Sequence, residues 1–548
     1  MVKVREVGVF VANMRTRMPF RYGIAAMTVV PHVFVRVAVE VDGRQSRGIP
    51  GVAADHLPPK WFTKDPGTTY EADVAEMLGV IDEAAALAVG VGEAESVFDW
   101  WRGVYGGMMG EESGVENGKW RVEGGSRAKP QAAGAKPQAA PGRRAKPQAA
   151  LLRGFGVSLV ERAVMDAFCR AMGVPFGQAL RENLLGMRLG EIHPELAGYE
   201  PAGLLPAAAL RSITVRHTVG LGDPLTPGDV TPAERVEDGL PQSLEEAIKA
   251  YGLTHFKIKL CGDPKRDLER LTRIAKVIVS DTREFAFTLD GNEQYHQVAP
   301  FRELWETLAG DELLKPFLKR MIVVEQPLHR DMALSEQAEI LLRDWKDRPP
   351  IIIDESDAEL GSLRRAIECG YVGTSYKSCK GVFKGVANAC LIEFMNRLRG
   401  DDDVEAKRQG FVMTGEDLCN VGPVALLQDL AVAANLGIEH VERNGHHYFA
   451  GLSMLPPEVQ ELVLGAHGDL YQRVDPGVER GMERGMERGV EREEGQRSLV
   501  TVKIEGGRVA VGSVVDAVGL GVGYGVEELD VARWPRREDW EFGNLSSG

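Results

Sequence analysis

The chain has 548 residues, 44% of them hydrophobic and 26% charged, which is the composition of an ordinary globular protein. Its formal net charge of −15 argues against nucleic acid or an anionic membrane surface as a partner. The N-terminus alternates like a strand instead of carrying the apolar core of a signal peptide, and no run of about 18 apolar residues occurs. The six scattered cysteines include no Cys-x-x-Cys pair. We therefore expect a cytoplasmic protein without a membrane span.

The N-terminal region is rich in strand signals. KVREVGVFVA and PHVFVRVAVEV alternate apolar and polar residues, and the second run ends at a tight-turn signal that begins at Asp42. The intervening segment, Asn13–Ala26, is interpreted as an arginine-rich loop. It is either a solvated loop or a lid that brings Arg15, Arg17 or Arg21 to an anionic substrate, because guanidinium groups suit carboxylates.

Two low-complexity segments interrupt the chain. The hexapeptide AKPQAA occurs three times within an insert at about 126–150, between the regions 70–105 and 155–185, both of which have helical spacing. GVER, GMER, GMER and GVER follow one another in a second insert at about 477–495. Neither insert carries residues that anchor a core, so we expect flexible or solvated segments with no catalytic role.

The central part of the chain contains short apolar runs that each end in a charged residue. The first five are at 255–260, 285–293, 321–327, 350–356 and 373–381. The charged ends are spaced by 31, 35, 29 and 23 residues, which is the length of one strand plus one crossover helix. Three further runs, at 212–220, 410–415 and 438–445, give eight strands in all. This pattern predicts a parallel barrel whose strand ends meet on one rim.

Three carboxylates end successive strands of this predicted barrel. Asp290, Glu325 and Asp354 are hard oxygen donors of the kind that Mg²⁺ prefers, with Mn²⁺ as a substitute, and no His or Cys occupies a matching position as zinc would require. The alternative is that each acid only caps the helix after its strand. Because neighbours in a strand point to opposite sides, either Asp354 or Glu355 faces the metal, but not both.

Lysines lie on both sides of these acids. Lys257 and Lys259 point the same way, and Lys377 lies four strands farther on, about half-way round an eight-stranded barrel. Surface lysines would be the ordinary interpretation of any one of them, but together with the acids they indicate catalysis. A carboxylate substrate held by a divalent cation has an acidified α-proton, and an ammonium group can stabilise the charge that develops when this proton leaves.

Five motifs carry a resemblance to a known family: KIK at 257–259, LDGNE at 289–293, VEQP at 324–327, DES at 354–356 and K-x-x-K-G at 377–381. In this order and spacing they resemble the mandelate racemase/muconate lactonising enzyme group of the enolase superfamily. The resemblance implies a TIM-like (β/α)₇β barrel at 211–455. It also implies an α+β capping domain at 1–210, to which the segment 456–548 returns.

The resemblance also implies roles for individual residues. Asp290, Glu325 and Asp354 would bind Mg²⁺, Lys259 and Lys377 would be the acid/base pair on opposite faces of the substrate, and Lys257 would hold the substrate carboxylate.

Other motifs bear on the substrate. The segment MTGEDL (413–418) lacks the histidine of the mandelate racemase branch, and HVERNG (440–445) lacks the Asp-x-Asp of dipeptide epimerases, so dipeptides are disfavoured. Glu416 and Arg21 are expected to contact the substrate, and the cap segments Asn13–Ala26 and Gly48–Lys64 are expected to determine its specificity.

The expected partner is a small carboxylate, with a homo-oligomer implied by the resemblance. The expected reaction is racemisation, epimerisation or cycloisomerisation through an enediolate. One alternative is a lyase, such as an acid dehydratase or an o-succinylbenzoate-synthase-like enzyme. The other is a catalytically retired binding or assembly protein that uses its inserts as contact segments.

Overall fold

The computed structural model describes residues 1–42, 44–110, 115–116, 119–120, 149–399, 410–475 and 498–542. The AKPQAA copies, apart from Ala149 and Ala150, and all the GVER and GMER repeats lie outside the described residues. Within the described part of the chain, no helix has the length and apolar content needed to cross a membrane.

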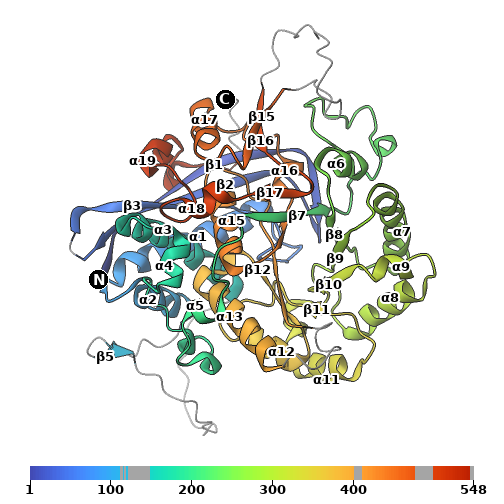
Figure 1. The fold of residues 1–548 in the computed structure, drawn as a ribbon, viewed down its shortest axis with the longest axis horizontal. Helices are drawn as coiled ribbons and strands as arrows, with labels where there is room; N and C mark the ends of the chain where they lie inside the picture. Colours follow the sequence, from blue (N-terminus) through green and yellow to red (C-terminus); the bar gives the residue numbers. More distant parts are fainter. Residues whose placement is uncertain are drawn as a thin grey trace, which may run out of the picture.

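Eight parallel strands form a barrel, as the sequence predicted (Figure 1). The hydrogen-bonded order is β11-β10-β9-β8-β7-β14-β13-β12, and a parallel bridge between Ile353 and Thr374 joins the two ends of this order. The strands are β7 (Ser212–Val219), β8 (His255–Lys259), β9 (Ala286–Asp290), β10 (Met321–Glu325), β11 (Ile351–Ile352), β12 (Gly373–Tyr376), β13 (Val412–Gly415) and β14 (His440–Arg443). Every parallel pair places its carboxyl ends on the same rim.

Helices connect successive barrel strands and surround the barrel (Figure 1). They are α6 (Leu244–Tyr251), α7 (Pro264–Asp281), α8 (Val298–Gly310), α9 (Lys315–Leu318), α10 (Arg330–Ala333), α11 (Glu336–Asp344), α12 (Ser362–Cys369), α13 (Val382–Leu398) and α15 (Ala425–Leu436). A capping box opens α6: the Ser243 hydroxyl accepts from the backbone N–H of Glu246, whose carboxylate accepts from the N–H of Ser243. Gly252, in the left-handed conformation, ends that helix.

The N-terminal region forms an antiparallel sheet of order β3-β2-β1-β4, covered by helices. The elements are β1 (Val2–Tyr22), β2 (Ala25–Val41), β3 (Arg44–His56), β4 (Glu93–Ala94), β5 (Val115–Glu116), β6 (Lys119–Trp120), α1 (Tyr70–Gly90), α2 (Val97–Met109), α3 (Ala150–Met172), α4 (Phe176–Arg181) and α5 (Pro201–Leu204). Helix α3 is buried along most of its length because it packs against β2, β3 and the barrel turn after β12. Gly51 of β3 allows this close approach, since a Cβ there would lie 2.2 Å from the backbone oxygen of Ala163.

The prediction of a loop over Asn13–Ala26 was wrong. Strand β1 continues to Tyr22 and pairs with β2 almost to the tip, with one register shift between Arg15 and Phe20. Side chains at even positions from Met14 to Tyr22 are buried and the arginines lie between them, so the period of two is that of a strand with one polar face. The arginines suggested a loop because their charge masked this alternation.

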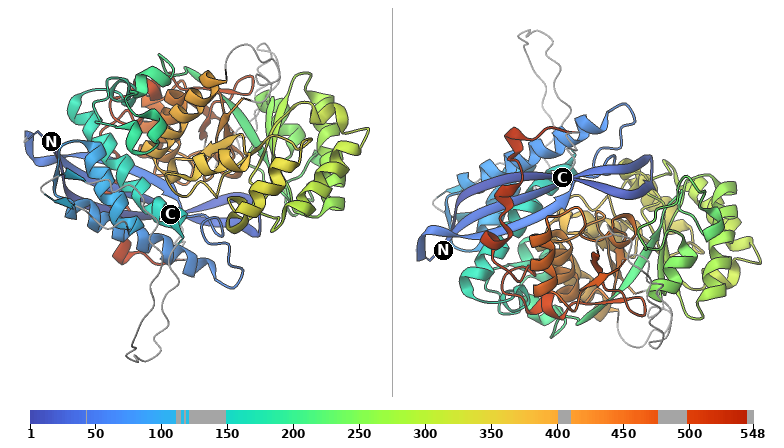
Figure 2. Two further views of the ribbon diagram at one scale, coloured as in Figure 1. Left: turned by 90° about the horizontal axis from the view of Figure 1, so that it is seen from below. Right: turned by 90° about the horizontal axis from the view of Figure 1, so that it is seen from above.

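The far end of the β1–β2 hairpin reaches across to the barrel, as both views in Figure 2 show. Phe20 stacks on Tyr448 with ring centroids 4.2 Å apart, and the Tyr22 hydroxyl donates to the Pro59 oxygen at 2.9 Å. Tyr448 belongs to α16 (Gly445–Tyr448), which follows the last barrel strand. The hairpin tip therefore covers the rim on which the charged strand ends meet.

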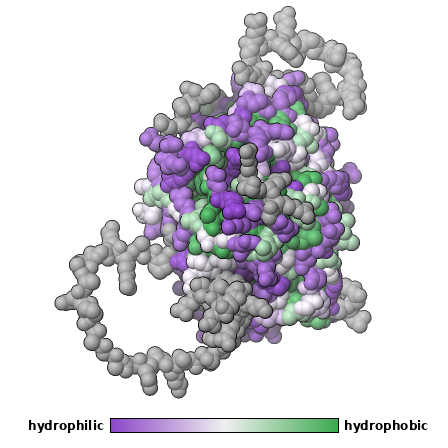
Figure 3. Space-filling model, turned by 90° about the vertical axis from the view of Figure 1, so that its left-hand side faces the viewer, coloured by the Kyte–Doolittle hydropathy of each residue, from purple (hydrophilic) through white to green (hydrophobic). Residues whose placement is uncertain are grey.

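The C-terminal segment contacts both parts of the molecule. Its elements are α17 (Pro457–Ala466), β15 (Tyr471–Val474), β16 (Leu499–Val502), β17 (Arg508–Ala510), α18 (Gly512–Asp516) and α19 (Val526–Leu529). Strand β17 pairs with β7 of the barrel, whereas Trp534 stacks on Phe34 of the N-terminal sheet at 4.4 Å. The side of the molecule drawn in Figure 3 is mostly hydrophilic with scattered hydrophobic patches.

Candidate active site

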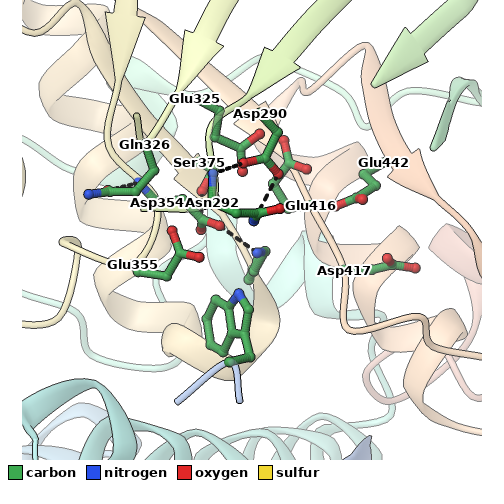
Figure 4. A network of polar contacts seen from close by, with 12 residues as sticks. Asp290, Asn292, Glu325, Gln326, Asp354, Glu355, Ser375, Glu416, Asp417 and Glu442 are labelled. Carbon is green, nitrogen blue, oxygen red and sulfur yellow. Dashed lines mark hydrogen bonds and ion pairs between the residues drawn. The ribbon is translucent and has the colours of Figure 1, made fainter. Parts of the chain in front are cut away.

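Buried carboxylates converge at the carboxyl ends of the barrel strands. Asp290 and Glu325 end β9 and β10, Asp354 follows β11, Glu416 follows β13, and Glu442 lies in β14. All five are at most 2% exposed, and Figure 4 shows the carboxylates of Asp290, Glu325, Asp354 and Glu416 turned toward a common space. We call these five residues the carboxylate cluster. Burying so many acids is costly unless cations compensate them, and the cations are on the same rim.

Lys257 lies in the middle of the carboxylate cluster. Its ammonium group donates to Glu325 and Glu442 at 2.9 Å each and also to Glu416, and it lies 3.0 Å from Asp290. Burial opposes the charge, but these carboxylates outweigh it and raise the pKa of Lys257 well above its usual value. An ammonium group has three donors, so none is left for a substrate carboxylate. In this arrangement Lys257 holds the acids together.

Lys259 and Lys377 approach the cluster from two sides. The Lys259 ammonium donates to Asp290 Oδ2 at 2.6 Å, and the Lys377 ammonium donates to Asp354 Oδ2 at 2.6 Å. They come from β8 and from the end of β12, four strands apart in the barrel. Burial lowers the pKa of Lys377, but the Asp354 carboxylate outweighs it and the net pKa is raised.

The acids of the cluster have pKa values shifted in opposite directions. Burial raises the pKa of Asp354, but the ammonium groups of Lys377 and Lys380 dominate and hold it well below its usual value. Burial and then the neighbouring Glu416 raise the pKa of Glu325 well above its usual value. The pKa values of Glu325 and Asp354 are thus shifted in opposite directions within one cluster.

The donor set fits a divalent cation. The three predicted ligands are carboxylates, which are the ligands that Mg²⁺ prefers. Glu325 Oε2 is buried without a hydrogen bond, and its near neighbour is the Lys257 ammonium group at 2.9 Å, a position that a cation could take. In the described residues no three His, Cys, Asp or Glu side chains form a group that could hold a metal ion as they stand. The reason is that lysine ammonium groups lie among the acids, so a metal would require Lys257 or the carboxylates to turn.

The neighbouring acid Glu355 faces the cap. Asp354 contacts Lys377 and Lys380, whereas Glu355 Oε1 lies 3.3 Å from the ammonium group of Lys64 in the segment after β3. The structure thus places Asp354 in the carboxylate cluster and Glu355 outside it. Alternation along the strand alone had left open which of these two neighbouring acids faces the site.

The segment after β3 is fixed over the rim by ion pairs. Arg330 of α10 donates to both oxygens of Glu293 at 2.7 Å and to the backbone oxygens of Trp61 and Phe62 at 2.9 Å. Lys64 lies 2.7 Å from Glu293 on the same side. These contacts place the Trp61 ring 4.4 Å from the Lys377 ammonium group, a cation–π distance.

A pocket lies between the hairpin tip, the Trp61 segment and the two lysines. Its polar lining includes Lys259 and Lys377, and its apolar lining includes Phe20, Tyr22 and Trp61. The free volume is about 30 Å³, roughly the room of two water molecules. A carboxylate substrate therefore enters only when part of the cap moves. We call this space the lysine pocket.

The predicted substrate-contacting residues fall in different places. Glu416 lies inside the carboxylate cluster, where Arg216, Lys257 and Thr414 donate to it. Arg21 does not line the lysine pocket. It is exposed on the opposite side of the hairpin, as expected when Phe20 and Tyr22 point inward.

Several residues of the site had no predicted role. Lys380 lies 2.8 Å from Asp354 Oδ1, and the Gln326 side chain accepts from the backbone N–H of Asp354 at 2.7 Å. Both lie within motifs that the sequence analysis quoted, so position in a motif was the available signal. Trp61 and Lys64 lie in no such motif. They belong to the cap segment Gly48–Lys64, which was expected to bear on substrate specificity only as a whole, and the folded cap brings them to the rim.

No family model and no curated protein matches the chain. Solved structures do match it. A 2-chloromuconate cycloisomerase from Rhodococcus opacus 1CP is 15% identical with a TM-score of 0.54, covering 97% of this chain and 100% of that one. A muconate lactonizing enzyme from Pseudomonas Fluorescens, complexed with muconolactone, is 15% identical with a TM-score of 0.51 over 98% and 99%. A mandelate racemase/muconate lactonizing protein from Herpetosiphon aurantiacus is 15% identical with a TM-score of 0.51 over 95% and 98%.

The chain has the mandelate racemase/muconate lactonizing fold. The five motifs predicted this fold, and the prediction is confirmed. At 15% identity the likeness establishes the fold alone, because one fold supports many chemistries.

Proposed function

We propose that this protein is an enzyme of the mandelate racemase/muconate lactonising group that removes the α-proton of a small carboxylate. The observation that supports this most is that Lys259 and Lys377, from strands four apart in the barrel, line the same small pocket. Two bases on opposite faces of one carbon can remove a proton from one side and return it to the other. This is the requirement of a racemase or epimerase, and a cycloisomerase needs the same first step.

Asp290, Glu325 and Asp354 would hold Mg²⁺, with Mn²⁺ as a substitute. The metal would bind the substrate carboxylate and stabilise the negative charge that develops on it. The chain's own residues do the remaining work. Lys257 keeps the carboxylate cluster compact. The Asp354 carboxylate raises the pKa of Lys377, and a cation bound to Asp354 would offset this negative charge, so that one lysine could lose its proton and accept the α-proton while the opposite lysine donates one.

The cap keeps bulk water out of the lysine pocket. Phe20, Tyr22 and Trp61 close the lysine pocket, so a carbanion-like intermediate formed there is protected from bulk solvent. Because these side chains are apolar and aromatic, we propose that the part of the substrate beyond its carboxylate is largely apolar.

Exchange of the α-proton with deuterium tests the proposal. The protein is incubated in D₂O with Mg²⁺ and a panel of carboxylates, and proton NMR follows loss of the α-proton signal of each enantiomer. Lys259→Ala and Lys377→Ala should each abolish exchange of one enantiomer and keep exchange of the other. Lys276→Ala, which alters an exposed lysine on α7, is the matched control and should exchange both.

If both site variants exchange both enantiomers as fast as the wild type, the two-base assignment is wrong. Loss of water or of another leaving group from the substrate would identify a lyase. A wild-type protein that exchanges no carboxylate and shows no thermal shift with Mg²⁺ would be a binding protein and would refute the proposal.

A further inference from the structure

A second pocket lies on the other side of the hairpin tip. It is formed by the end of β1, the segment between β7 and α6, and helix α7, and its free volume is about 530 Å³. Ligand pockets for small molecules commonly have this size. Its arginine lining comes from all three elements: Arg17, Arg21, Arg235, Arg270 and Arg273. We call it the arginine pocket.

Two of these arginines are neutralised within the protein. Arg17 is 3% exposed and forms a bidentate ion pair with Asp238, at 2.5 and 2.7 Å. Arg273 lies 2.9 Å from Asp229. These two side chains fix the walls of the pocket by tying the hairpin and α7 to the segment between β7 and α6.

The other three arginines have no carboxylate partner within 4 Å among the described residues. Arg21 and Arg235 are exposed and donate no side-chain hydrogen bond there. Arg270 donates only to the backbone oxygens of Gly220 and Asp223, and its Nε is buried without a partner. Burial lowers the pKa of Arg270, and the nearby Asp223 carboxylate offsets only part of this shift.

The acids that line the pocket are already engaged. Asp223 accepts from the Gly220 N–H at 2.7 Å and from the Tyr448 hydroxyl at 2.6 Å, and Glu234 accepts from the Thr231 hydroxyl at 2.7 Å. Five arginines surround the cavity against four acids, namely Asp223, Asp229, Glu234 and the Asp238 that pairs with Arg17, so in a protein with a net charge of −15 its walls carry a small excess of positive charge.

Arg21 is held where it can face a ligand. The Leu221 N–H donates to the Arg21 backbone oxygen at 3.1 Å, and the Arg21 side chain lies flat against Gly222. A Cβ at Gly222 would lie 2.9 Å from both Cδ and Nη1 of Arg21, so any other residue would displace this guanidinium group.

We propose that the arginine pocket binds a small molecule carrying a dianionic group, a phosphate or a pair of carboxylates, through Arg21, Arg235 and Arg270. Planar guanidinium forks suit such oxygen arrays because they can donate two parallel hydrogen bonds to each. Since Arg21 alternates with Phe20 and Tyr22 on the same strand, this site is separate from the lysine pocket and shares only the hairpin as a wall.

Calorimetric titration of the full-length protein with inorganic phosphate and, separately, with malonate tests this proposal without any assay of catalysis. We expect saturable binding of at least one of them, and the tighter of the two identifies the ligand as a phosphate ester or a dicarboxylate. Arg21→Ala and Arg235→Ala should each weaken binding about tenfold, the loss expected when one charge-assisted hydrogen bond is removed.

Arg15→Ala is the matched control, because Arg15 is an exposed arginine on the same strand outside the pocket, and it should bind as the wild type does. Gly222→Ala keeps every arginine and should still weaken binding by displacing Arg21. Because the side chains of Arg21 and Arg235 donate no hydrogen bond to any described residue, their variants should unfold at the wild-type temperature. The proposal is overturned if neither anion binds saturably, or if Arg21→Ala and Arg235→Ala bind as tightly as Arg15→Ala.

Discussion

Replacing Arg330 with methionine should destabilise the protein and loosen the cap over the site. Arg330 makes a bidentate ion pair with Glu293, whose side chain is fully buried, and donates to the backbone oxygens of Trp61 and Phe62. Burial raises the pKa of Glu293, but Arg330 and Lys64 dominate and hold it at about 2.

The size of the effect follows from what Arg330→Met leaves behind. Removing one partner of a buried ion pair costs about 3–5 kcal/mol, because the other charge stays buried. Lys64 remains 2.7 Å from Glu293 and compensates part of that charge, so we expect a loss of about 3 kcal/mol. Urea denaturation monitored by tryptophan fluorescence measures it.

Two further variants make this test decisive. Arg364→Met breaks an ion pair with Glu195 in which the arginine is 52% exposed, and it should cost less than about 1 kcal/mol. In a double-mutant cycle, Arg330→Met combined with Glu293→Gln should cost less than the sum of the two single changes. If Arg330→Met lowers the free energy of unfolding no more than Arg364→Met does, the ion pair between Arg330 and Glu293 does not hold the cap on the barrel.

Three other outcomes are expected. Trp61→Leu should slow deuterium exchange on the Lys377 face by about threefold to thirtyfold, the worth of one cation–π contact, and equal slowing on both faces would contradict it. Saturating Mg²⁺ should stabilise the wild type by about 2–3 kcal/mol and so raise its unfolding temperature. Asp290→Asn should lose most of this shift in unfolding temperature. If the shift is unchanged in the variant, Asp290 is not a metal ligand. Burial lowers the pKa of His56 to about 4, so the buried imidazole is neutral at and above pH 6.5. As the pH falls from 6.5 toward 4, the unfolded state binds a proton that the folded state does not, and the free energy of unfolding should fall by about 3 kcal/mol. Because His32 is buried beside it without a hydrogen-bond partner, His32→Phe should flatten this acid-side loss in pH-dependent denaturation, and an unchanged slope would contradict it.

Much of the barrel could be predicted because its signals are local. Each strand is a short apolar run, and the distance from Lys259 to Asp290, or from Asp290 to Glu325, is set by one crossover helix. The alternation of side chains along a strand then fixes which of them share a face. The same rule explains the error at Asn13–Ala26, where a strand with an arginine face was taken for a loop.

The contacts that each predicted site residue makes in the folded protein could not be predicted from the sequence. Lys257 was expected to meet a substrate, but contacts from β10, β13 and β14 use all three of its donors. Arg21 was expected in the substrate pocket, but the direction of one side chain on the hairpin places it in the arginine pocket. Both outcomes depend on segments far apart in the chain.

The sequence by itself determined the barrel, the order of its charged strand ends and the residue types on its rim, because periodicity and spacing are properties of neighbouring residues. The tertiary structure decided which charges pair, how small the lysine pocket is, and that Trp61 covers Lys377. Those features arise where the cap meets the barrel. Contacts of that kind join segments such as Trp61 and Arg330 that are 269 residues apart, and no local pattern encodes them.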